Sequence, residues 1–231
     1  MLKQLKKDLR DLADPKKAKI LQRFFKTGKG EYGEGDVFLG VVVPKQRMLV
    51  KKYWRDLDLK DLDKLIKSKI HEERLIALLI LVYQYQSLNT KSLIFKFYLS
   101  RTKYINNWDL VDLSAPNIVG EYLIDKNRAI LYRLARSKSL WERRIAILST
   151  FAFIKRGDYA DTLKIAKILI KDTHDLIHKA TGWMLREVGK RCKKTLLINF
   201  LNNHYKQMPR TMLRYAIERL DQKTKKKFLK I

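Results

Sequence analysis

The segment NNWDLVDLSAP, residues 106–116, places an aromatic ring and two carboxylates close together. Trp108 and Asp112 are four residues apart, so on a helix they share one face. Asp109 points away from that face, and near the helix start it is favoured by the helix dipole. One of the two preceding asparagines is expected to cap the helix. Asp112 lies further into the helix and is less easily explained in that way, so it is a candidate for a functional role.

A repeated pattern predicts the scaffold that positions these residues. ERLIALLIL (73–81) and ERRIAILST (142–150) share Glu-Arg-x-Ile-Ala-x-Leu. A small residue recurs at a spacing of 31 to 38 residues, the length of one helix pair, at Ala77, Ala115, Ala146, Ala180 and Ala216. We therefore predict an all-α fold in which about six antiparallel helix pairs form a right-handed superhelical solenoid with a basic concave face.

Helical periodicity continues through most of the remaining chain. Pro15 and Pro44 fit the first turns of helices, and Pro116 is expected to end or kink one. GKGEYGEG (28–35) is glycine-rich but lacks the ending of a phosphate-binding loop, which argues against a nucleotide site. DVFLGVVVP (36–44) is expected to be an extended linker whose apolar side chains pack into the core.

Three residues of chemical interest occupy comparable places in consecutive repeats. Asp112 lies three positions before its repeat alanine, Arg144 two before, and Trp183 three after. The second helices of a solenoid line its concave face, so we expect these side chains and Trp108 to meet there. Core packing for the tryptophans, an arginine partner or a capping role for Asp112 and a solvated surface position for Arg144 remain open. Arg143 is expected to be a solvated surface charge.

The chain carries 51 Lys and Arg against 24 Asp and Glu, a formal net charge of +27. Part of this excess can reflect a Lys-, Ile- and Asn-rich composition, but the remainder indicates a polyanionic partner. The apolar run 75–83 is too short to span a bilayer, so a membrane partner is not expected. The predicted DNA contacts are Arg144, Lys45, Arg47, Lys179, Arg210 and Arg214.

Metal and disulfide chemistry are not expected. Cys192 is the only cysteine, and the four histidines are scattered along the sequence. The amphipathic N-terminal segment lacks the apolar core of a signal peptide. We therefore expect a cytoplasmic monomer with a single domain over residues 1–231, no metal, no cofactor and no obligate protein partner.

The chain resembles the bacterial DNA alkylation repair family of the AlkD type, which are HEAT-like repeat DNA glycosylases. The resemblance covers nearly the whole chain and includes residues 30–47, WDLVD (108–112) followed by Ala-Pro, WERRIAIL (141–148), GWMLRE (182–187) and LRYAIERL (213–220). It implies that Asp112 is the catalytic carboxylate, that Trp108 and Trp183 flank the lesion nucleotide, and that Arg144 contacts the DNA backbone.

The resemblance implies release of 3-methyladenine and 7-methylguanine from double-stranded DNA, the first step of base excision repair. These bases are cationic and need no general acid, whereas positive charge develops on the sugar as they leave. A carboxylate held near that sugar stabilises the charge. A non-catalytic module that binds damaged or structured nucleic acid is the alternative, and a protein-binding scaffold is a third possibility. The binding module does not account for Asp112, which would repel phosphate, and the net charge argues against the protein-binding scaffold.

Overall fold

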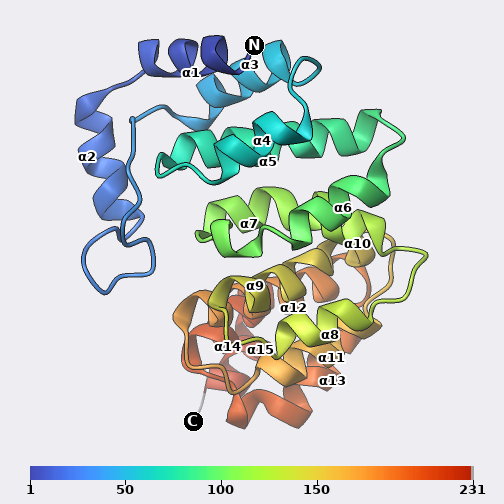
Figure 1. Cartoon of the computed structure of the whole chain (residues 1–231). Coiled ribbons are helices and arrows are strands. Elements are labelled where there is room, and N and C mark those ends of the chain that lie inside the picture. Colours follow the sequence, from blue (N-terminus) through green and yellow to red (C-terminus); the bar gives the residue numbers. More distant parts are fainter. Residues whose placement is uncertain (230–231) are drawn as a thin grey trace. The chain divides into compact units, whose positions relative to one another are not determined.

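The structure is a computed structural model that describes residues 1–229, and residues 230 and 231 lie outside them. Within the described residues the regular structure is helical, apart from an isolated bridge between Val37 and Ile70 (Figure 1). The all-α prediction is confirmed. The chain forms two compact units with the boundary between Ser114 and Ala115, and each unit is described by itself. The single-domain organisation, the right-handed superhelix and its concave face stay predictions.

The first unit runs from the N-terminus to the helix that carries Trp108. Its elements are α1 (Leu2–Asp11), α2 (Pro15–Phe24), α3 (Val43–Tyr53), α4 (Leu59–Ile66), α5 (His71–Ser87), α6 (Lys91–Leu99), the 3₁₀ turn η1 (Thr102–Tyr104) and α7 (Trp108–Ala115). The apolar α5 packs against α3 and α4, with most of its residues buried.

The second unit begins at the last residue of α7. Its elements are the π-helical turn η2 (Pro116–Gly120), α8 (Ala129–Ala135), α9 (Leu140–Ser149), α10 (Phe151–Ile154), α11 (Ala160–Leu169), α12 (Asp175–Arg191), α13 (Lys194–His204), η3 (Tyr205–Gln207), α14 (Arg210–Ile217) and α15 (Gln222–Leu229). No helix within residues 1–229 has the combined length and apolar character needed to cross a membrane.

The prolines act as their positions predict. Asp14 caps α2 by accepting hydrogen bonds from two backbone N–H groups, and Pro15 occupies the first helical position. Pro44 lies in the first turn of α3. At Pro116 the α-helical hydrogen bonding of α7 ends and the backbone continues as η2.

Residues 36–42 pack as an extended linker, as predicted, whereas residues 43 and 44 already belong to α3. Phe38 and Val41 are buried, whereas Val37 and Val42 face solvent. Gly40 has φ of 85°, and a Cβ there would lie 2.1 Å from the carbonyl oxygen of Asp14. Only glycine permits this approach, which brings the linker against the start of α2.

The five repeat alanines are all completely buried, as the repeat pattern predicts. In the second unit α12 packs against both α9 and α14, so three consecutive repeat helices lie side by side (Figure 1). A Cβ on Gly182 would lie 2.4 Å from the carbonyl oxygen of Met212, because the backbones of α12 and α14 nearly touch. Small residues therefore set the helix spacing in this unit.

Candidate functional site

The start of α7 holds the candidate carboxylate and one candidate tryptophan. Asn107 is the capping residue that the sequence predicts, because its side-chain oxygen accepts from the N–H of Trp108 at 2.8 Å and its carbonyl accepts from Val111 at 3.3 Å. Trp108 and Asp112 lie one turn apart on α7, and both are half-buried. The first unit therefore places this pair on one helix face.

The negative charge of Asp112 affects the buried Tyr98 in the same unit. Tyr98 is fully buried under α7, and its hydroxyl lies 2.9 Å from the hydroxyl of Ser114. Burial raises the pKa of Tyr98, the hydrogen bond with Ser114 opposes the rise, and the negative charge of Asp112 adds to it. A neutral phenol is thus maintained beside the candidate carboxylate.

Aromatic side chains from the N-terminal segment surround Trp108. The ring of Phe25 stacks on the indole, with centroids 5.1 Å apart and an interplanar angle of 12°. Phe24 meets the indole edge-on at 5.9 Å and is itself 61% exposed. Offset and edge-to-face contacts of this kind restrict ring orientation. The indole is therefore held on one side while remaining partly accessible to solvent.

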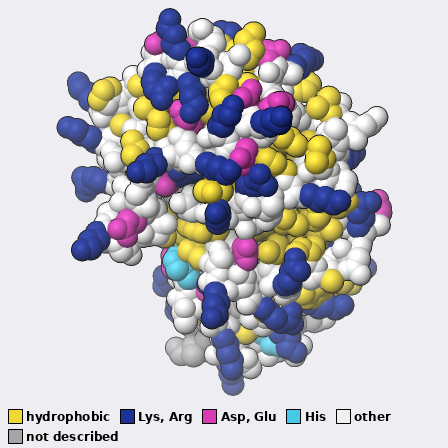
Figure 2. Space-filling view, in the orientation of Figure 1, with side chains coloured by type: hydrophobic (Ala, Val, Ile, Leu, Met, Phe, Trp, Pro, Cys, Tyr) yellow, Lys and Arg dark blue, Asp and Glu magenta, His cyan; other side chains and the backbone are white. Residues whose placement is uncertain are grey.

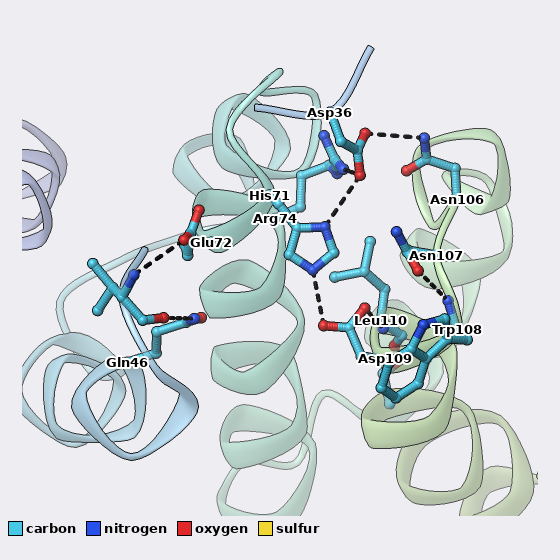
Figure 3. A network of polar contacts seen from close by, with 12 residues as sticks. Asp36, Gln46, His71, Glu72, Arg74, Asn106, Asn107, Trp108, Asp109 and Leu110 are labelled. Carbon is cyan, nitrogen blue, oxygen red and sulfur yellow. Dashed lines mark hydrogen bonds and ion pairs between the residues drawn. The ribbon is translucent and has the colours of Figure 1, made fainter. Parts of the chain in front are cut away.

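A buried charge network lies beneath the start of α7 (Figure 3). His71, the first residue of α5, has Nδ1 3.1 Å from Oδ2 of Asp36 and Nε2 2.8 Å from Oδ2 of Asp109. Arg74 donates to Oδ2 of Asp36 at 2.5 Å. Asp109 lies in the first turn of α7, where the helix dipole was expected to favour it, but its partner is this histidine.

The network sets the ionisation of its members. Burial tends to lower the pKa of His71, but the charge of Asp109 and hydrogen bonds to Asp109 and Asp36 outweigh it, so the pKa is raised. Burial tends to raise the pKa of Asp36, but the hydrogen bond with His71 and the charge of Arg74 outweigh it, so the pKa is lowered. The charged forms of both groups are favoured.

The buried carboxylate of Glu72 holds the linker in place. Glu72 accepts hydrogen bonds from the backbone N–H groups of Leu39, Gly40 and Val41, at 2.9–3.2 Å. The fixed linker borders a mainly apolar cavity of about 340 Å³, which Phe24, Phe25 and Phe38 help to line. Glu72 therefore secures the linker that forms one wall of this cavity.

The second unit carries the other two candidate site residues on helices that pack together. Arg144 of α9 is 5% exposed, and its guanidinium donates to the carbonyl oxygen of Leu176 at 2.5 Å. Trp183 of α12 is half-buried, with its ring 6.1 Å from that of Phe151. The open possibility that Arg144 is a solvated surface charge is therefore wrong, because its side chain is buried between elements.

Arg143 is not a solvated surface charge either. Its guanidinium forms an ion pair with Asp172 at 2.6 Å and donates to the carbonyls of Ser137 and Lys138. The side chain is mostly buried, and it ties α9 to the turn before α12. It is therefore a structural residue of this unit.

Lys and Arg side chains are spread over the face shown in Figure 2 and outnumber the acidic ones. Lys45 is exposed and Arg47 half-buried, both on α3 of the first unit. Arg210 and Arg214 of α14 are exposed, and Lys179 of α12 forms an ion pair with Asp175 at 2.7 Å. The structure thus leaves these DNA contacts as predictions, and Lys179 has a competing partner.

Sequence reasoning missed the part played by His71. Its carboxylate partners lie 35 and 38 residues away along the chain, so the sequence pattern does not indicate that they meet. The only local sign is a histidine at the start of an otherwise apolar helix. Within residues 1–229 no group of three or more His, Cys, Asp or Glu side chains is arranged to hold a metal ion.

Comparison with known proteins places the chain in a family. Residues 5–220 match the family of DNA alkylation repair enzymes. A predicted DNA alkylation repair enzyme from Enterococcus faecalis shares 16% identity at a TM-score of 0.68, with 91% of this chain and 97% of that chain covered. AlkD2 from Streptococcus mutans also shares 16% identity, at a TM-score of 0.56, with 88% and 97% covered. No curated protein matches the sequence.

The two solved structures share only 16% identity with this chain, so they support the all-helical fold alone. The family match is of another kind, because it extends over nearly the whole chain, including the segment with Trp108 and Asp112 and both helices with Arg144 and Trp183. The chain belongs to the DNA alkylation repair enzyme family.

Proposed function

We propose that the protein is a DNA glycosylase that hydrolyses the N-glycosidic bond of positively charged alkylated purines in duplex DNA. Its substrates are 3-methyladenine and 7-methylguanine, and the product is an abasic site for base excision repair. One observation carries the proposal: Asp112 and Trp108 lie one turn apart on α7, half-buried, in a protein of net charge +27.

The chemistry follows from the charge of the substrate. An alkylated purine leaves as a neutral base, so no general acid is required. Positive charge develops on the deoxyribose as the bond breaks, and Asp112 stabilises it and orients the attacking water. The indole of Trp108 adds cation–π attraction. A carboxylate on a basic surface is thus explained, because the DNA is anionic while the transition state is locally cationic.

In this proposal, residues of the second unit bind the DNA. Trp183 contacts the lesion nucleotide, and Arg144 acts on the DNA backbone. The buried guanidinium of Arg144 also donates a hydrogen bond to the carbonyl oxygen of Leu176. The planar fork of N–H donors on a guanidinium suits a phosphate, which supports the proposed role.

Release of bases from methylated duplex DNA tests the proposal. Free 3-methyladenine and 7-methylguanine are measured by chromatography after incubation with the wild type, with Asp112→Asn, and with Asp56→Asn as a control at an exposed carboxylate of the same unit. The wild type and the control should release base. Asp112→Asn should bind DNA normally and release base about 10² times more slowly.

Two results would contradict the proposal. Unchanged release by Asp112→Asn would remove the carboxylate from the mechanism. No release by the wild type, with tight salt-dependent binding to DNA, would replace the enzyme with a non-catalytic binding module.

A further inference from the structure

His71 is buried with both ring nitrogens facing carboxylate oxygens. The residue is 1% exposed, with Asp36 on one side and Asp109 on the other (Figure 3). A neutral imidazole has one N–H and one lone pair. In either neutral tautomer, one carboxylate would therefore meet a lone pair. Only the doubly protonated imidazolium donates to both.

The surrounding charges agree with that assignment. Asp36 from the linker and Asp109 from α7 supply two negative charges, and Arg74 from α5 supplies one positive charge at 2.5 Å from Asp36. Glu72, the next residue of α5, directs its carboxylate to the N–H groups of the linker instead. A charged His71 balances the pair of aspartates, whereas a neutral one leaves an uncompensated buried charge.

Aromatic contacts connect the imidazole ring of His71 to Trp108 through Phe25. Phe38 stacks on His71 at 4.4 Å and 19°, and Phe25 lies 5.1 Å from the same ring. Phe25 then stacks on Trp108 at 5.1 Å and 12°. The negative faces of aromatic rings attract a cation. His71 therefore reaches Trp108 in two ways. Its Nε2 contacts Asp109, the residue after Trp108, and its ring makes a tilted contact with Phe25, which packs on the indole.

We propose that His71 acts as a buried imidazolium that positions Trp108, by joining Asp36 of the linker to Asp109 at the start of α7. It is a positioning residue, since it acts on the substrate only through the indole. The effect on base release rests on the proposed function, but the protonation of His71 and its coupling to Trp108 do not.

The direction of the pH dependence follows from the raised pKa of His71, in which the two carboxylates outweigh the opposing effect of burial. The link is complete below the ordinary histidine pKa of about 6.5. It is lost as the pH rises through the higher pKa of the folded protein. Loss of the proton should loosen the start of α7 and, with it, the orientation of the indole.

Nuclear magnetic resonance of the intact chain tests the protonation state directly. With ¹⁵N-labelled histidine, both ring nitrogens of His71 should carry protons at pH 7. Assignment uses His71→Gln and His204→Gln, the second being the matched control. A neutral single tautomer of His71 at pH 7 in the wild type would overturn the proposal, and this measurement does not require any variant to be active.

Fluorotryptophan labelling tests the coupling to Trp108. The ¹⁹F resonance of Trp108, assigned with Trp108→Phe, should shift with the same pH midpoint as His71. That shift should vanish in His71→Gln and persist in His204→Gln. A Trp108 resonance that ignores the titration of His71 would contradict the positioning role, even if the histidine proves to be charged.

The activity arm compares base release by the same variants. His71→Gln should slow release about tenfold at pH 6.5, as expected for a misplaced contact group, and leave little dependence on pH above that value. His204→Gln should behave as the wild type. Unchanged release and an unchanged pH profile in His71→Gln would refute the role in catalysis. Absence of release by the wild type would instead refute the proposed function, with the resonance measurements still deciding the role of His71.

Discussion

The two units hold their candidate site residues by different means. In the first unit, the start of α7 is fixed by buried charges, with His71 and Arg74 set against Asp36 and Asp109. In the second, α9 and α12 are fixed by close helix packing, and Gly182 lets α12 approach α14. Charged contacts depend on direction and on protonation, whereas packing depends on volume. Changes in charge and pH should therefore act on the first unit, and changes in side-chain volume on the second.

The largest effect is expected from removing one member of the charge network. Asp36→Ala leaves His71 and Arg74 buried without their shared partner, which should cost about 3–5 kcal/mol of the free energy of unfolding. Hydrogen exchange should increase in α5 and α7 and stay unchanged in α12. Asp56→Ala, at an exposed position, serves as the control. A cost below about 1 kcal/mol, the range of an exposed ion pair, would show that the network is not the anchor of this unit.

A volume change should have the converse effect on the second unit. Gly182→Ala puts a Cβ 2.4 Å from the carbonyl oxygen of Met212, so α12 and α14 must separate. We expect a loss of about 1–3 kcal/mol in stability, despite alanine's higher helix propensity. Faster hydrogen exchange confined to α12 and α14 is the readout, and Lys190→Ala on the same helix is the control. A stabilised variant would mean that the two helices are not tightly packed.

The response to pH should have opposite signs in the two units. The raised pKa of His71 makes the first unit lose stability as the pH rises above about 6.5, with a slope of at most about 1.4 kcal/mol per pH unit. Burial lowers the pKa of His174, so the second unit loses stability as the pH falls below that value. Hydrogen exchange of α5 and α12 between pH 5 and 9 separates the two, once intrinsic exchange rates are corrected. The same sign in both units would contradict this comparison.

The smallest effects concern surface charges that bind DNA. Replacing Lys45 and Arg47 with Gln in the first unit, or Arg210 and Arg214 in the second, should lower the slope of log affinity against log salt by about two. The exposed Lys206 provides a control substitution on the second unit. If one double variant leaves the slope unchanged, that unit contacts DNA through other residues.

The sequence predicted features that depend on local pattern. Helical periodicity and the recurrent alanines predicted an all-α chain, and those alanines are completely buried. Pro116 marked the end of α7 because proline lacks an N–H and clashes with the preceding turn. These effects act within one or two helices, so a single sequence contains enough information to find them.

Long-range polar contacts could not be predicted from the sequence. The partners of His71 lie on a linker and on another helix, and nothing in their spacing reports the contact. Asp109 was assigned to the helix dipole, which describes its place but not its partner. Arg143 was given a solvated position, whereas Asp172 pairs with it from the turn before α12. Each miss is a tertiary ion pair, whose formation depends on the whole fold.

The most direct measurement compares Asp109→Asn with Asp112→Asn, two changes of the same size on one helix. Base release per folded molecule is measured in single turnovers, together with thermal stability. The account predicts that Asp109→Asn loses stability and slows release less than Asp112→Asn does, because it displaces a contact group and leaves the carboxylate of Asp112 in place. It predicts that Asp112→Asn slows release per folded molecule about 10²-fold or more. Equal losses of release in the two variants, or full release by Asp112→Asn, would contradict it.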